Sequence, residues 1–179
     1  ELQSYISDEV TQAYWENYIW DPESGQPQVD GKRVLALLNL LNEAFQINPE
    51  YAEAAIALEQ ERVHKLSEFG EACSFFFEEV PTMDAVAVKK WFSQPHVIDM
   101  FRYLSRTISS KDSPVEADYE AVLRDYQTSS GLEKLGPVVH PVRVALTGRT
   151  FGPGLWELMT VLGKERILHR LKQAESLIP

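Results

Sequence analysis

The sequence predicts an all-α protein made of two consecutive helical bundles. Apolar residues recur at spacings of three and four through most of the 179 residues, which is the period of an amphipathic helix. No stretch alternates apolar and polar residues for long enough to indicate a strand. We place the junction between the bundles near Pro81, so residues 1–81 form the first bundle and residues 82–179 the second.

Capping residues and breaks in the apolar stripe define the helices of the first bundle. Ser7 is a candidate N-cap for the first helix and Asp30 for the second. Asn48 followed by Pro49 indicates another helix start, because proline suits the first helical turn. The stripe then changes register near residues 62–66, where we expect a break. The expected helices cover residues 8–20, 34–45, 49–62 and 66–77, with a long loop at 21–31.

Similar signals divide the second bundle. The run from Ser113 to Glu116 reads as a capping box with Pro114 at the first helical position. Gly148 is expected to end one helix, and Gly163 to separate the last two. The expected helices cover residues 84–92, 97–108, 114–126, 138–146 and 155–162, with a last helix after Gly163.

The composition excludes several classes of protein. Hydrophobic residues make up 44% of the chain and aromatic residues 11%, so a disordered or collagen-like chain is excluded. No apolar run approaches the roughly 18 residues that cross a bilayer, so we expect no contact with a membrane. Cys73 is the single cysteine; it can form no internal disulfide and fits a reducing compartment. Because the first residue is Glu1, we expect the chain to be a piece of a longer protein.

Charge is distributed unevenly along the chain. The net charge is −10, which at face value argues against nucleic acid, because phosphate binding needs Lys and Arg. Residues 132–179 nevertheless hold seven Lys or Arg against four Glu, a net charge of +3. A basic end can bind a polyanion locally, since screening confines its field to about 10 Å. The alternative is an ordinary variation of surface charge.

No catalytic or metal-binding constellation is evident, and we expect no active site in this chain. The four histidines, at positions 64, 96, 140 and 169, stand at no metal-ligand spacing and are expected to be structural or surface residues. Cys73 lies on an apolar stripe with Phe76 and Phe77, which favours a buried hydrophobe over a nucleophile.

The stretch from residue 140 to residue 166 is the part of the sequence that suggests binding. A helix carrying Arg143 ends at a glycine, and a loop rich in Gly and Pro leads to the next helix. Such a loop can approach a ligand closely, and a helix N-terminus offers N–H donors. Arg143 and Arg149 supply forked donors, and Phe151 and Trp156 could stack on bases. The alternative is a helix–loop–helix corner with its aromatic side chains in the core.

Three motifs in this stretch resemble those of one family. They are Pro141–Gly148 (PVRVALTG), Gly152–Leu155 (GPGL) and Leu162–Arg166 (LGKER). Together they resemble the C-terminal signature of bacterial-type, class I glutamyl-tRNA synthetases. Ala57–Phe77 and Lys134-Leu-Gly136 also resemble the anticodon-binding region of that family. The resemblance covers most of residues 32–175, whereas the loop at 21–31 is longer than the family usually carries.

The resemblance implies an all-helical region that recognises the anticodon loop of tRNA(Glu). The family's catalytic motifs, of the His-Ile-Gly-His and Lys-Met-Ser-Lys types, are absent from this sequence. The parent enzyme would attach glutamate to tRNA with ATP and Mg²⁺, and this chain alone would hold no cofactor or metal and be inactive. A monomer in the cytoplasm is implied, with an organelle as the alternative compartment.

The family's contacts can be carried onto individual residues. Arg143 matches the arginine at the wobble region, and Gly152, Pro153 and Leu155 match the loop that lines the pockets of the first two anticodon bases. Some members have threonine at position 152, so glycine leaves only a backbone contact. Arg149, Phe151 and Trp156 are auxiliary candidates for RNA contact.

Arg62 matches the position where discriminating members place an arginine against the third anticodon base. A guanidinium can donate to the acceptors of cytosine but would face the N–H groups of guanine. The alternative is that Arg62 caps the C-terminus of its own helix. For the chain as a whole, the alternative function is a helical protein–protein interaction module without an RNA role.

Overall fold

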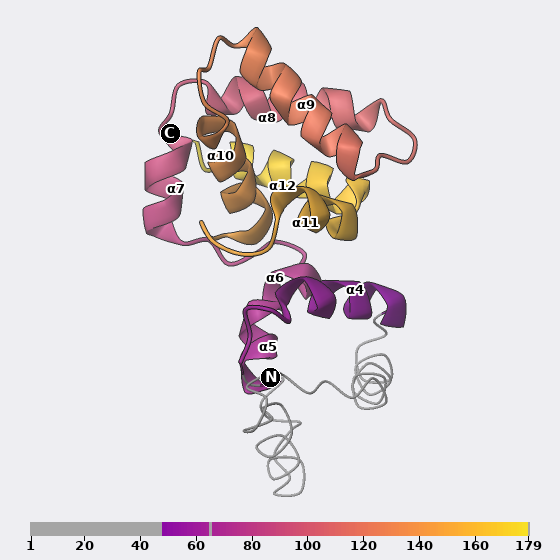
Figure 1. Cartoon of the computed structure of the whole chain (residues 1–179). Helices are drawn as coiled ribbons and strands as arrows, with labels where there is room; N and C mark the ends of the chain where they lie inside the picture. Colours follow the sequence, from indigo (N-terminus) through magenta and orange to yellow (C-terminus); the bar gives the residue numbers. More distant parts are fainter. Residues whose placement is uncertain (1–47, 65, 179) are drawn as a thin grey trace, which may run out of the picture. The chain divides into compact units, whose positions relative to one another are not determined.

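The computed structural model describes residues 48–64 and 66–178 (Figure 1). Within these ranges the regular structure consists of nine helices and no strand, which confirms the expected all-α class. The expected helices 8–20 and 34–45 and the loop 21–31 lie outside the described residues. The chain divides into two compact units, Glu1–Ser74 and Phe75–Pro179, ahead of the junction that we placed near Pro81. The bounds of the two bundles remain a prediction.

The described part of the N-terminal unit contains α4 (Pro49–Glu59) and α5 (Leu66–Ala72), and α6 (Ser74–Phe77) begins at its end. The predicted cap is confirmed, because Oδ1 of Asn48 accepts from the backbone N–H of Glu50 at 2.8 Å. Residues 60–64, which follow α4, are not helical, which confirms the break expected near residues 62–66. Cys73 is buried, as expected, and its thiol lies 3.9 Å from the carbonyl oxygen of Ala55.

Six further helices build the C-terminal unit. They are α7 (Ala85–Phe92), α8 (Val97–Ser109), α9 (Glu116–Ser129), α10 (Gly136–Thr147), α11 (Leu155–Leu162) and α12 (Lys164–Glu175). Helix α12 packs against α8 and α10, α11 packs against α9, and α10 also contacts α7 (Figure 1). Large side chains such as Phe92, Phe101 and Leu104 are fully buried between them and form the core. This packing holds α10 and α11, with the loop between them, on a rigid support.

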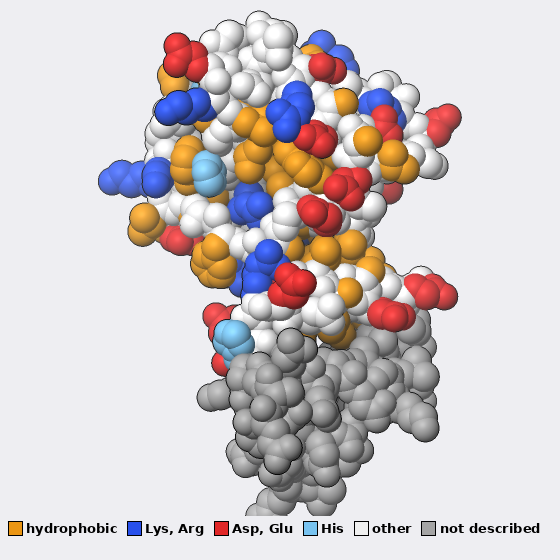
Figure 2. Space-filling view, viewed as in Figure 1, with side chains coloured by type: hydrophobic (Ala, Val, Ile, Leu, Met, Phe, Trp, Pro, Cys, Tyr) orange, Lys and Arg blue, Asp and Glu red, His pale blue; other side chains and the backbone are white. Residues whose placement is uncertain are grey.

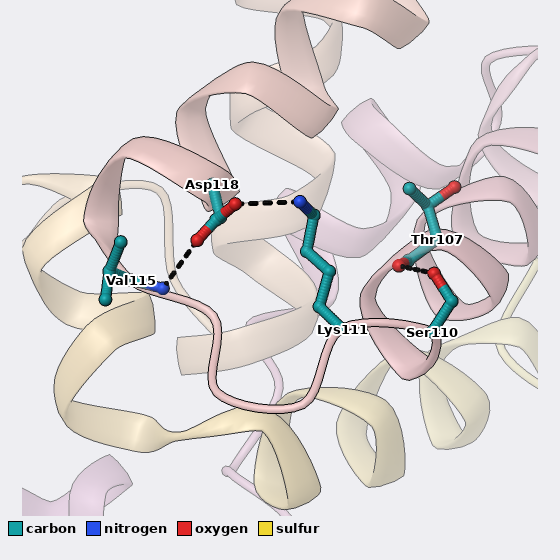
Figure 3. A network of polar contacts seen from close by, with 5 residues as sticks. All are labelled: Thr107, Ser110, Lys111, Val115 and Asp118. Carbon is teal, nitrogen blue, oxygen red and sulfur yellow. Dashed lines mark hydrogen bonds and ion pairs between the residues drawn. The ribbon is translucent and has the colours of Figure 1, made fainter.

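The start of α9 differs from the prediction. The helix begins at Glu116, after Pro114, so the capping box expected from Ser113 to Glu116 is wrong. Instead, the carboxylate of Asp118 accepts from the backbone N–H of Val115 at 3.0 Å and from Nζ of Lys111 at 2.7 Å (Figure 3). Both bonds, with Lys111 first, lower the pKa of Asp118. The ion pair from outside the helix favours the later start, since it adds a charged partner to the capping carboxylate.

Helix α10 contains a proline, and the helical hydrogen bond that this proline removes is replaced by a bond from His96, the residue before α8. Pro141 has no N–H, so the carbonyl oxygen of Pro137, four residues earlier, receives no bond from it. Nε2 of His96 lies 3.0 Å from that carbonyl and can donate to it. The bond replaces the missing helical one and ties the residue before α8 to α10.

Candidate functional site

The loop from Arg149 to Gly154, which we call the 149–154 loop, connects α10 to α11. It starts after Gly148, whose φ of 75° is left-handed and ends α10 as predicted. A Cβ at Gly148 would lie 2.0 Å from the carbonyl oxygen of Thr82, so this position accepts only glycine without rearrangement. The backbone N–H of Asp84 also donates to the carbonyl of Gly148 at 2.8 Å. The loop therefore begins at a point fixed to residues 82–84.

Arg143 holds the far end of the same loop. Its Nη1 donates to the carbonyl oxygen of Pro153 at 2.6 Å. The structure thus brings together two of the residues that the sequence assigned to one site. Pro153 is buried, and Leu155, the first residue of α11, is only 4% exposed, so the apolar side chains face inward. Gly152, which precedes Pro153, has a φ of 139°, a conformation that favours glycine.

Thr147 organises the start of the loop and was missed by the sequence analysis. Its side chain is 3% exposed, and its Oγ1 lies 2.8 Å from the carbonyl oxygen of Arg143 and 3.1 Å from that of Arg149. The backbone N–H of Arg149 in turn donates to the hydroxyl oxygen at 3.3 Å. The sequence signal that could have identified Thr147 is a hydroxyl side chain immediately before the glycine that ends the helix.

The auxiliary candidates occupy two environments. The side chain of Phe151 is 67% exposed, so the alternative of a core aromatic does not hold for this residue. The guanidinium of Arg149 lies 5.4 Å from the centroid of the Phe151 ring and 4.7 Å from that of Phe75. Trp156 is half-buried on the first turn of α11. Arg149 and Phe151 therefore form an accessible cation–aromatic pair on the loop, with Phe75 as a partner that sequence reasoning missed.

An acidic side chain lies at the N-terminus of α11. A Cβ at Gly154 would stand 2.0 Å from Oε2 of Glu157, so the carboxylate packs against the backbone of the helix start. A negative charge here favours the helix dipole and disfavours a phosphate at the same place. The helix N-terminus that we expected to offer donors to an anion is therefore occupied by this chain's own carboxylate.

The contact between α7 and α10 carries two rings and two cations. The rings of Trp91 and His140 stack with centroids 4.4 Å apart, and Nζ of Lys90 lies 5.0 Å from the centroid of the Trp91 ring. Burial, followed by the charges of Arg143 and Lys90, lowers the pKa of His140. His140 is therefore neutral at pH 7 and half-buried, in line with the structural role that we expected for it.

Arg62 belongs to the N-terminal unit. Its side chain is exposed, and its Nη1 donates to the carbonyl oxygen of Leu58 at 2.8 Å. This bond is the helix-capping alternative that the sequence analysis left open. The role of Arg62 at the third anticodon base remains a prediction.

The described ranges, 48–64 and 66–178, contain neither a metal-binding cluster nor a membrane-spanning helix. No group of three or more His, Cys, Asp or Glu side chains in them could hold a metal ion. None of their helices is both long and apolar enough to cross a membrane.

Comparison with known proteins identifies the family. Residues 33–175 match the model of a family described as the anticodon binding domain. Because the match covers most of the chain, this protein belongs to that family. The matched residues include α10 and α11, so the 149–154 loop lies inside the matched domain.

Curated relatives and solved structures bear glutamate–tRNA ligase names. Glutamate–tRNA ligase 2 of Thermoanaerobacter pseudethanolicus is 32% identical over 78% of this chain and 29% of its own length. The enzyme of Elusimicrobium minutum is 38% identical over 68% of this chain and 25% of its own length. A glutamate tRNA ligase of Elizabethkingia meningosepticum, crystallised with its amino acid, aligns with a TM-score of 0.73 and 26% identity over 84% of this chain and 30% of that one. The chain thus spans less than a third of each of these proteins.

Proposed function

We propose that this chain recognises the anticodon loop of tRNA(Glu) as the anticodon-binding region of a glutamate–tRNA ligase. The observation that carries the proposal is the bond from Arg143 to Pro153, which fixes the 149–154 loop while Phe151 stays 67% exposed. Sequence-specific RNA recognition targets single-stranded loops whose splayed bases stack on aromatic rings and guanidinium planes. An exposed Phe151 beside Arg149 suits that task.

The proposed division of labour places the chemistry outside this chain. The parent enzyme would join glutamate to tRNA with ATP and Mg²⁺ in a separate catalytic domain. Here Arg143, Gly152, Pro153 and Leu155 would shape the pockets of the first two anticodon bases, with Gly152 contributing backbone only. We further propose that the protein acts as a monomer in the cytoplasm, or in an organelle.

Binding of an anticodon stem-loop tests the proposal. We expect the 179-residue chain to bind the stem-loop of tRNA(Glu) at low salt and to prefer it over one with a scrambled anticodon. Arg143→Ala should weaken binding by about 1–3 kcal/mol, the usual value of a specific base contact. Lys172→Ala, on an exposed side chain of α12, is the control and should change it by less than about 0.5 kcal/mol.

The outcomes separate the proposal from its alternative. Equal losses in the two variants would contradict the assignment of the pocket to Arg143 and the 149–154 loop. No preference for the tRNA(Glu) anticodon would favour the interaction-module alternative, which needs no RNA.

A further inference from the structure

The carboxyl-terminal turn of α7 lies beside His140 in the first half of α10, because Trp91 stacks on His140. The N-terminal end of α7 meets the start of the 149–154 loop, where the backbone N–H of Asp84 donates to the carbonyl of Gly148. Helix α7 packs on α10, and its last turn contains Lys89 and Lys90, both with exposed side chains. Figure 2 shows basic side chains on both sides of a histidine over the region where α7 and α10 lie in Figure 1. The carboxyl end of a helix favours such cations through its dipole.

A continuous chain of contacts joins Lys90 to the loop. Its ammonium lies 5.0 Å from the Trp91 ring, which stacks on His140 at 4.4 Å. Arg143 follows His140 by three residues on α10, so the two share one face of that helix. Arg143 then donates to Pro153 of the 149–154 loop at 2.6 Å. The cations Lys90 and Arg143 thus flank His140 on one surface.

The balance of charge on this surface favours an anion. The charged groups that act on His140 are Arg143 and Lys90, both positive, and both oppose its protonation. The nearest acidic group on α7 is Asp84, which is engaged at the opposite end of the helix in capping Val86 and Ala87. By contrast, the start of α11 carries the Glu157 carboxylate. This balance of charge favours a phosphate near the carboxyl end of α7 over one at the start of α11.

We propose that the α7 surface formed by Lys89, Lys90 and Trp91 binds backbone phosphates of the RNA whose bases enter the 149–154 loop. The inference rests on the proposed function and extends it to contacts that carry no sequence information. In this arrangement the Trp91–His140 stack is a rigid support for Lys90, and the lysines position the RNA while Arg143 and the loop read its bases.

The salt dependence of RNA binding tests the inference. The probe is a labelled anticodon stem-loop, and its affinity for the 179-residue chain is measured at a series of salt concentrations. The slope of log K against log salt is negative, and each lost phosphate contact reduces its magnitude by about 0.7 on single-stranded RNA. We therefore expect Lys90→Ala to reduce the slope by about that amount and to weaken binding several-fold at low salt.

Matched variants make the result specific. Lys172 is also an exposed lysine in the last turn of a helix, so Lys172→Ala controls for the loss of one such charge and should leave the slope unchanged. Lys90→Arg should retain the wild-type slope. Lys90→Ala should weaken the binding of stem-loops with different anticodons by the same factor. Arg143→Ala should instead reduce the preference of the chain for one anticodon over another.

The failure of this inference differs from the failure of the proposed function. A wild-type chain that binds no stem-loop would overturn both. If the wild-type chain binds and Lys90→Ala keeps its slope and affinity, the α7 surface makes no phosphate contact, and the proposed function stands alone.

Discussion

Arginine side chains in this protein donate to backbone carbonyl groups at helix ends and in a loop. Arg62 donates to Leu58 near the end of α4 and Arg170 to Leu146 at the end of α10, whereas Arg143 donates to Pro153 in the 149–154 loop. The carboxyl end of a helix leaves carbonyl groups without partners, and a guanidinium with five donors can satisfy them. A structural bond and an RNA contact can therefore use the same residue, and mutagenesis has to separate the two.

For Arg62, mutagenesis can separate the bond to Leu58 from the proposed contact with the third anticodon base. Arg62→Gln in the full-length enzyme should relax rejection of tRNA(Gln), because an amide presents either a donor or an acceptor to the third base. Loss of the bond to Leu58 should lower stability by only about 1 kcal/mol. Charging of tRNA(Glu) and tRNA(Gln) by both enzymes is the measurement. Efficient charging of tRNA(Gln) by the wild-type enzyme would remove the discriminator role from Arg62.

His140 should make stability depend on pH. Its pKa is lowered from the ordinary 6.5 by burial and by two cations, so the unfolded chain binds the proton more readily. The stabilisation is fully present above pH of about 6.5 and is lost as the pH falls below that value toward the lower pKa of the folded state. In urea unfolding at pH 7.5 and pH 5, His140→Gln should lose less stability on acidification than the wild-type chain.

If His140→Gln showed the full wild-type difference, another group would be responsible for the acid sensitivity.

At the scale of elements, the position of the loop depends on how α10 ends. Gly148 has a left-handed φ and lies against Thr82, whereas Gly131 has a φ of 67° with no atom within 4 Å of a Cβ. The two positions share the backbone conformation and differ in the space available. They therefore form a matched pair for measuring how much the close approach of residue 148 to Thr82 contributes to stability.

Gly148→Ala should destabilise the chain by about 3 kcal/mol or more, because it combines a left-handed alanine with a backbone clash. Gly131→Ala should cost only about 1 kcal/mol, for the backbone conformation alone. Urea unfolding measures both. Because Gly148 anchors the 149–154 loop, its variant should also weaken stem-loop binding; equal effects of the two variants would show that the contact with Thr82 is unimportant.

Local chemistry made several elements predictable from the sequence, and long-range contacts limited others. The cap at Asn48 and the ends at Gly148 and Gly163 follow from residues that act on their own backbone. The start of α9 was missed because Lys111, seven residues before Asp118, strengthens the capping carboxylate through an ion pair that spacing alone does not reveal. The exposure of Phe151 and the support from Phe75 also depend on tertiary packing.

At the scale of the C-terminal unit, the basic residues near the end of the sequence do not all contribute to the surface charge. Arg170 is one of the seven Lys or Arg residues that make residues 132–179 basic in the sequence. The structure buries Arg170 completely, so this charge stabilises the interior and is unavailable to RNA. The basic surface around His140 comes instead from α7 and α10, whose contact no count of residues along the chain could have shown.

Arg170 joins three segments that are distant in the sequence. Its guanidinium donates to the carbonyl oxygens of Phe75 at 2.6 Å, Glu78 at 2.5 Å and Leu146 at 2.5 Å. The side chain of Glu78 accepts from the backbone N–H of Thr82 at 3.0 Å, and Thr82 packs against Gly148. Residues 75–82 are thus held along the end of α10, and with them the ring of Phe75 beneath Arg149.

Removing this guanidinium should affect both stability and the loop. Arg170→Met keeps the volume but leaves three buried carbonyl groups without their donor, so we expect a loss of about 3–5 kcal/mol. Arg170→Lys should recover part of that loss, since one ammonium cannot reproduce the fork. Arg166→Met is the control, because Arg166 lies one turn earlier on α12 and its exposed side chain donates to the carbonyl oxygen of Phe76 at 3.1 Å; loss of that bond should cost about 1 kcal/mol. Urea unfolding measures the free energy of unfolding of each variant. Limited proteolysis at low urea should cut the Arg170→Met variant first within residues 75–84, because those residues lose their attachment to α10. Similar stability of the Arg170→Met and Arg166→Met variants would show that the three carbonyl bonds do not hold this segment.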